Sequence, residues 1–195
     1  MRPDEEIEAS EAAHRRLLAS VDGLGDEQMA EPSSLPGWTR AHVISHLARN
    51  ADSHTWLFEG AMVGEVRHQY PSLETRQEEI EAGADRAPQV LRDDLRAACD
   101  RIESAWRDLG DDGWEREGIV VSGPRTMGEI VFRRLREIEV HHVDLDAGYA
   151  PSAWSAVYVE GELDRRLRGL PDRADHRDLV SWLLGRGEPP ELAAW

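Results

Sequence analysis

Residues 35–51 read LPGWTRAHVISHLARNA and join a turn to the start of a helix. The proline-glycine pair near the beginning is typical of a loop. Thr39, which follows it, is a residue type that favours the N-cap position of a helix. Neither proline nor glycine interrupts the chain from there to Glu59, and apolar residues recur at helical spacing. We therefore predict a long amphipathic helix over residues 39–59.

Other segments of the chain also carry signals of helix or strand. Thr126, followed three residues later by Glu129, forms a capping-box pattern that predicts another helix start. Residues 119–121 are a short apolar run with the character of a strand. Further helices are predicted over residues 3–21, 72–85, 88–109, 126–144, 154–167 and 175–184.

This pattern predicts a mainly α protein with little strand. Long helices joined by long connections are typical of a helix bundle. We expect residues 1–150 to form a four-helix bundle and residues 151–195 to form a short C-terminal segment packed on it. A chain of 195 residues is long enough to bury a core without disulfides.

The composition excludes several classes of protein. The chain has 39 acidic and 23 basic residues, a formal net charge of −16, which argues against binding to nucleic acid or to an anionic membrane. Cys99 is the single cysteine, so neither an intrachain disulfide nor a multi-cysteine zinc site is possible. No signal peptide or membrane-spanning run is visible, and we expect a cytoplasmic location. The sequence leaves the oligomeric state open.

Two of the predicted helices carry side chains that can bind a metal ion. Glu137 and His141 are four residues apart, so they share one helix face. A third ligand from a facing helix would complete a site with open coordination positions, as catalytic metals require. His46 is the natural candidate, but His42 lies one turn earlier on the same face, and spacing does not separate the two. The competing interpretation is a half-buried histidine with an ordinary hydrogen-bond partner.

Three stretches resemble one family. Residues 35–51 are similar to its signature PGW-T-x-x-x-V-x-x-HL. Residues 136–145, REIEVHHVDL, resemble its R-E-x-x-x-H-x-x-D-L motif, and residues 179–187, LVSWLLGRG, resemble its C-terminal W-L-x-G-R. The family is that of the mycothiol-dependent maleylpyruvate isomerases, within the DinB/YfiT-like group of metal-binding four-helix bundles. The three matches occur in the family's order along the whole chain.

The resemblance implies a set of site residues. It makes His46, and not His42, a metal ligand together with Glu137 and His141, and it gives Arg186 a place in the active site. The implied cofactors are a divalent metal and mycothiol. Zinc is the ion expected, while nickel, cobalt and iron(II) accept the same donors. Members of the family carry a longer C-terminal region, so the resemblance does not carry their substrate over to this chain.

Together these features predict a metal-dependent enzyme. We expect it to use a low-molecular-weight thiol, mycothiol, for isomerisation or S-transfer on a small electrophilic substrate. A metal-dependent hydrolase that activates water with the same site is one alternative. A non-catalytic bundle that binds a ligand or a protein is the other. Asp144 is either a partner that orients His141 or an exposed acid, and Cys99 is expected to be a buried, inert thiol.

Overall fold

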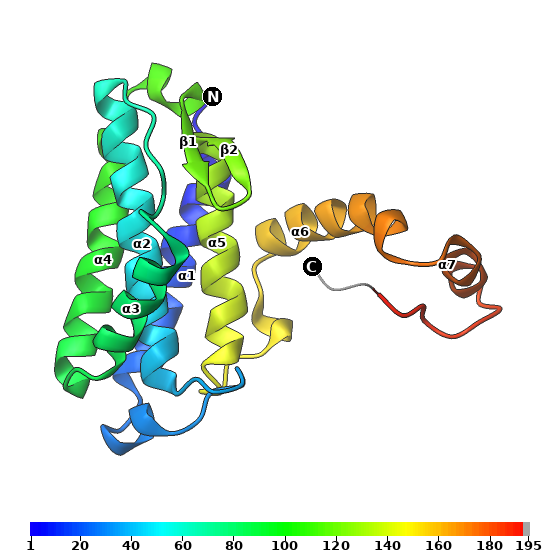
Figure 1. Ribbon diagram of the computed structural model, residues 1–195, viewed down its shortest axis with the longest axis horizontal. Helices are drawn as coiled ribbons and strands as arrows, with labels where there is room; N and C mark the ends of the chain where they lie inside the picture. The colour runs from blue at the N-terminus through cyan, green and yellow to red at the C-terminus, as the bar shows by residue number, and fades with distance from the viewer. Residues whose placement is uncertain (193–195) are drawn as a thin grey trace. The chain divides into compact units, whose positions relative to one another are not determined.

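A computed structural model describes residues 1–192. Its backbone contacts divide the chain into two compact units, Met1–Tyr158 and Val159–Trp195. The first unit holds four long helices: α1 (Asp4–Asp22), α2 (Arg40–Val63), α4 (Pro88–Asp108) and α5 (Met127–Asp144). Figure 1 shows them side by side as a bundle, in which α1 and α2 each pack against both α4 and α5. The predicted mainly α bundle is confirmed.

Apolar residues from all four long helices fill the centre of the bundle. They repeat every three or four positions, so each helix turns one stripe inward and leaves its charged residues outside. Fully buried examples are Leu17, Val21, Ile44, Leu47, Leu95, Ile102, Leu135 and Ile138. This core fixes which faces of α2 and α5 look toward each other.

Helix α2 begins as predicted and ends later than predicted. Thr39 is its N-cap, and the Thr39 hydroxyl accepts a hydrogen bond from the backbone N–H of His42 at 3.4 Å. The predicted end at Glu59 is wrong because Gly60 does not break the helix, which runs on to Val63. A Cβ at Gly60 would lie 2.7 Å from the side chain of Arg67. The glycine therefore admits a close neighbour inside a continuous helix.

A shorter helix, α3 (Leu73–Ala84), packs against the outside of α2. The two backbones approach closely at Gly83, where a Cβ would lie 2.0 Å from the Ser45 hydroxyl. That hydroxyl donates a hydrogen bond to the carbonyl of Ile80 at 2.9 Å. The contact fixes α3 along α2, because any larger residue at position 83 would push the helices apart.

A β-hairpin leads into α5. Strand β1 (Glu117–Val120) pairs antiparallel with β2 (Gly123–Thr126), with Glu117 opposite Thr126. The apolar run at residues 119–121 predicted only the first strand, since the second reads Gly-Pro-Arg-Thr and has no strand pattern. Thr126 ends the hairpin and forms the predicted capping box with Glu129, which starts α5.

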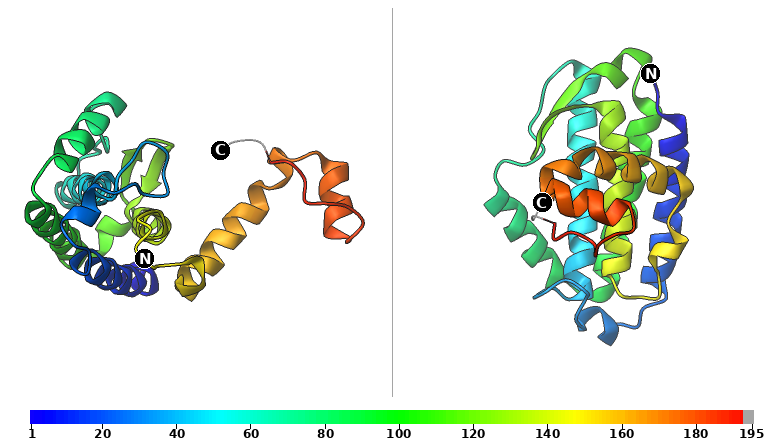
Figure 2. Two further views of the ribbon diagram at one scale, coloured as in Figure 1. Left: turned by 90° about the horizontal axis from the view of Figure 1, so that it is seen from below. Right: turned by 90° about the vertical axis from the view of Figure 1, so that its right-hand side faces the viewer.

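The chain beyond the bundle contains two more helices. These are α6 (Ala156–Gly169), which begins in the first unit, and α7 (His176–Leu183), whose N-cap Asp175 accepts from two backbone N–H groups. Figure 2 shows both helices from two further directions. The expectation that this segment packs on the bundle stays a prediction. Within residues 1–192, no helix combines the length and the apolar character needed to cross a membrane.

Candidate metal centre

Three side chains from two facing helices meet on the inner side of the bundle. His46 comes from α2, and Glu137 and His141 come from α5. One ligand atom from each lies within 4.8 Å of the others. Oε2 of Glu137 is 3.1 Å from Nε2 of His46 and 3.6 Å from Nε2 of His141. Two imidazole nitrogens and a carboxylate oxygen form a donor set that suits a divalent transition-metal ion.

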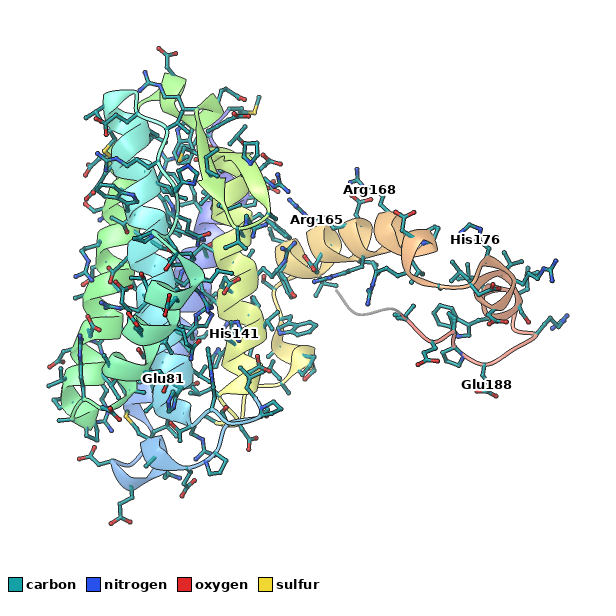
Figure 3. All side chains as sticks on the ribbon, in the orientation of Figure 1. Glu81, His141, Arg165, Arg168, His176 and Glu188 are labelled. Carbon is teal, nitrogen blue, oxygen red and sulfur yellow. The ribbon has the colours of Figure 1, made fainter. Side chains whose placement is uncertain are left out.

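His141 is oriented by a second carboxylate. Its Nδ1 lies 2.8 Å from Oδ2 of Asp144, and its other ring nitrogen faces Glu137. Figure 3 labels His141 on the side of α5 that faces α2. A carboxylate on the outer nitrogen is the arrangement that fixes the tautomer of metal-binding histidines. Asp144 is therefore a partner of His141, which agrees with the first of its two predicted roles.

His46 is enclosed more fully than the other two residues. The ring of Trp38 lies 5.6 Å from the His46 ring, between centroids, and Nη2 of Arg76 lies 3.1 Å from His46 Nδ1. Gly37 has a φ of +79°, a conformation that glycine adopts readily, and this turn brings Trp38 against the site. Burial lowers the pKa of His46, so its imidazole is neutral, which is the form that binds metals.

Glu137 supplies the negative charge at this centre. Burial acts to raise its pKa, but the hydrogen bond from His46 and favourable electrostatic interactions with the neighbouring histidine rings outweigh burial and hold the pKa well below its usual value. The carboxyl group is therefore ionised at neutral pH. An ionised carboxylate beside two imidazoles attracts a cation to this place.

His42 lies outside the cluster. Its Nδ1 is 2.7 Å from the Thr39 hydroxyl, and its Nε2 is 3.0 Å from Oε2 of Glu81 on α3. It thus completes the capping box at the start of α2. The spacing of the two histidines did not decide which of them is the third candidate ligand. In the structure, His46 lies next to Glu137 and His42 does not.

Two residues near the centre lie outside the set of ligands predicted from the sequence. Arg76 lies in an acidic helix that pattern alone assigns to the surface. His54, two turns after His46 on α2, is fully buried, and burial lowers its pKa to about 3. Its Nδ1 is without a hydrogen-bond partner within the described part of the chain. A turn-by-turn comparison of α2 would have found His54, because it repeats the position of His46.

Arg186 lies in the second unit, after α7. Its side chain is exposed, and its backbone N–H donates to the carbonyl of Ser181 at 2.8 Å. The preceding Gly185 takes a positive φ of 66°, so the chain turns there. The role of Arg186 in the reaction stays a prediction.

Comparisons with known proteins give a consistent result. The family model described as the mycothiol maleylpyruvate isomerase N-terminal domain matches residues 10–146. A crystal structure of the mycothiol-dependent maleylpyruvate isomerase has a TM-score of 0.79 and 29% identity, covering 82% of this chain and 67% of that one. A histidine-to-alanine variant of that isomerase has the same TM-score and coverage at 28% identity.

A third solved structure is similar to this chain only in its fold. YfiT from Bacillus subtilis, described as a probable metal-dependent hydrolase with an unusual four-helix bundle topology, has a TM-score of 0.58 at 22% identity. The match covers 78% of this chain and 89% of that one. A search of curated proteins finds no match. The family model covers well over half of the chain, from within α1 to just past the end of α5, and the chain therefore belongs to the mycothiol maleylpyruvate isomerase N-terminal domain family.

Proposed function

We propose that the protein is a metal-dependent enzyme that uses a low-molecular-weight thiol, mycothiol, for isomerisation or S-transfer on a small electrophilic substrate. The observation that carries the proposal is the convergence of His46, Glu137 and His141 within 4.8 Å of one another. Support for the thiol comes from the family and from the mycothiol-dependent isomerase that shares the fold.

The three side chains fit a divalent ion by their donor chemistry. His46 and His141 offer neutral nitrogens, Glu137 offers a charged oxygen, and Asp144 holds the ring of His141 in place. A bound divalent ion would supply Lewis-acid chemistry and deprotonate a coordinating thiol. Zinc is the ion we propose, and nickel, cobalt and iron(II) suit the same donors.

The chemistry proposed for the thiol needs no oxidant. In isomerisation, the thiolate sulfur adds to an activated double bond, the resulting single bond rotates, and expulsion of the thiolate restores the double bond. In S-transfer, the same sulfur displaces a leaving group, which departs with the bonding electrons. The chain's residues bind and orient both reactants, and the reactive sulfur comes from outside the protein.

The test is purification without a histidine tag, followed by elemental analysis and a screen of electrophiles. Each electrophile, maleylpyruvate included, is incubated with the protein in the presence and in the absence of mycothiol. We expect one divalent metal per chain and turnover that requires the thiol. Turnover by water without thiol would instead make the protein a hydrolase. Absence of metal would favour a non-catalytic binding bundle.

Cys99 is expected to be dispensable for activity. Its side chain is buried, and burial raises the pKa of the thiol, which disfavours the reactive thiolate. Cys99→Ala should keep thiol-dependent activity within a few-fold of the wild type, measured as kcat/KM at saturating thiol. A loss of more than about a hundredfold, or 2.7 kcal/mol in transition-state stabilisation, in a protein with an unchanged circular dichroism spectrum would refute the imported-thiol mechanism.

Arg186 is expected to act on substrate and not on the metal. Its planar guanidinium suits bidentate binding of a carboxylate. We expect Arg186→Ala to lower kcat/KM at least tenfold, or about 1.4 kcal/mol, while metal content and Tm stay the same. Arg186→Lys should recover activity only in part, since a lysine lacks the planar fork. Unchanged kinetics with a lowered Tm would show that the arginine only stabilises the end of α7.

A further inference from the structure

Arg76 reaches the metal centre from α3, outside the four-helix bundle. Its Nη2 lies 3.1 Å from Nδ1 of His46, while Nε2 of that ring lies 3.1 Å from the Glu137 carboxylate. A guanidinium can only donate hydrogen bonds, and an ionised carboxylate can only accept them. These two partners therefore define the His46 tautomer, with the proton on Nε2 and the lone pair on Nδ1.

This arrangement is incompatible with a metal ion on a neutral His46. If the ion binds Nε2, the ring must carry its proton on Nδ1, where it would face the donors of Arg76. If the ion binds Nδ1, it takes the lone pair that accepts from Arg76. In either case, the hydrogen bond between Arg76 and His46 must break before the ion is bound.

The charge of Arg76 is also poorly compensated. Among residues 1–192, no carboxylate forms an ion pair with Arg76, and its side chain is half-buried. The neighbouring arginines differ, since Arg49 and Arg86 both pair with Asp94, at 2.7 and 3.1 Å. A half-buried guanidinium without a counter-charge is suited to an anionic ligand.

We propose that Arg76 competes with the metal for His46 and that, once displaced, it binds a carboxylate of the electrophilic substrate beside the ion. This inference rests on the proposed metal centre. Helix α3 is held against α2 at Gly83 and Ser45, so the guanidinium stays near the centre after it leaves His46. The ring of Tyr70, 5.7 Å from Cζ of Arg76, offers it a cation–π surface.

Metal binding at His46 and carboxylate binding at Arg76 should be linked thermodynamically. Metal binding releases Arg76 for the carboxylate, and a carboxylate that engages Arg76 keeps it away from His46. Each ligand therefore strengthens the binding of the other by the same factor. Removing the guanidinium should separate the effects: metal binding becomes tighter, while carboxylate binding becomes weaker.

The first experiment measures zinc affinity by competition with a chromophoric chelator. Metal-free wild type is compared with Arg76→Met and with Arg86→Met, a matched control that removes the same charge near the end of α3 without touching His46. We expect Arg76→Met to bind zinc at least tenfold more tightly and Arg86→Met to stay within about threefold of the wild type, because it loses only a weak surface interaction.

The possible results distinguish failure of the proposed competition from failure of the proposed metal centre. Equal zinc affinity in wild type and Arg76→Met, or an equal gain in Arg86→Met, overturns the competition. If neither wild type nor Arg76→Met binds zinc, the metal centre falls and the inference falls with it. Zinc binding by Arg76→Met alone would support the competition in its strongest form.

The second experiment titrates maleate, a simple dicarboxylate, into the zinc-loaded proteins by calorimetry. We expect the Kd of maleate to rise at least tenfold in Arg76→Met and to change little in Arg86→Met. Arg76→Lys should give an intermediate value, since a lysine keeps the charge and loses the bidentate geometry. An unchanged Kd in Arg76→Met would overturn the carboxylate-binding role.

Discussion

His46→Ala should lose the metal and, with it, thiol-dependent turnover. The substitution removes the one ligand that α2 contributes to the cluster, and the two ligands left on α5 hold an ion much less tightly. We expect the metal content to fall from one equivalent to near zero after dialysis. We expect kcat/KM to fall at least a hundredfold, which corresponds to about 2.7 kcal/mol. Elemental analysis and the mycothiol-dependent assay measure the two quantities.

His42→Ala is the matched control for this prediction. His42 lies one turn earlier on the same helix and contacts Thr39 and Glu81. Its loss removes part of the cap of α2, at a cost of about 1 kcal/mol in the free energy of unfolding. Metal content should remain at one equivalent. Retention of metal in His46→Ala together with its loss in His42→Ala would show that the ligand is wrongly assigned.

Arg134→Met should cause a large loss of stability. Arg134 is fully buried on α5 and donates to the carbonyl of Leu47, to Oδ1 of Asn50 and to Nε2 of His14, at 2.8 to 3.1 Å. Methionine keeps the apolar stem and removes the donor from Oδ1 of Asn50 and from Nε2 of His14, while the Leu47 carbonyl keeps its hydrogen bond within α2. At about 1–3 kcal/mol for each unpaired buried group, we expect the free energy of unfolding to fall by about 3 kcal/mol or more.

Arg101→Met is the control, measured in the same urea titration. Arg101 is half-exposed on α4 and pairs with Asp52 on the surface. Such a pair contributes about 0–1 kcal/mol, so this variant should remain close to the wild type. Equal stability of the two variants would mean that the polar network around Arg134 does not hold α5 against α2.

Local signals in the sequence were sufficient to predict most helices. Thr39 and Thr126 mark helix starts because a side-chain oxygen there replaces a missing backbone partner, and this interaction needs no tertiary context. Gly60 misled the prediction of where α2 ends. A single glycine lowers helix stability by only about 1 kcal/mol relative to alanine, which the surrounding helix can tolerate. The packing of Arg67 beside Gly60 is a tertiary contact that a sequence pattern does not contain.

The candidate site was predictable in part. Glu137 and His141 share a face through helix geometry alone, so their proximity follows from the sequence. His42 and His46 also share a face, and only the packing of α2 against α5 separates them. One local signal for His42 was available, since it stands three residues after Thr39, at the position where a capping-box side chain returns to the N-cap.

The contact of Arg76 with His46 could not be predicted from sequence patterns. Arg76 lies on a short acidic helix whose charged residues read as a solvated surface. Its contact with His46 depends on the close approach of α3 to α2 at Gly83, which is a long-range packing event. Sequence patterns report periodicity along one element, and they carry little information on the face at which a second element docks.

The most direct test of the metal centre is an anomalous difference map from crystals of the zinc-loaded protein, collected on both sides of the zinc absorption edge. The account predicts one peak per chain, at about 2.0–2.2 Å from a ring nitrogen of His46, a carboxylate oxygen of Glu137 and a ring nitrogen of His141. A peak at other side chains, or none between these three in a protein that binds zinc in solution, would contradict it.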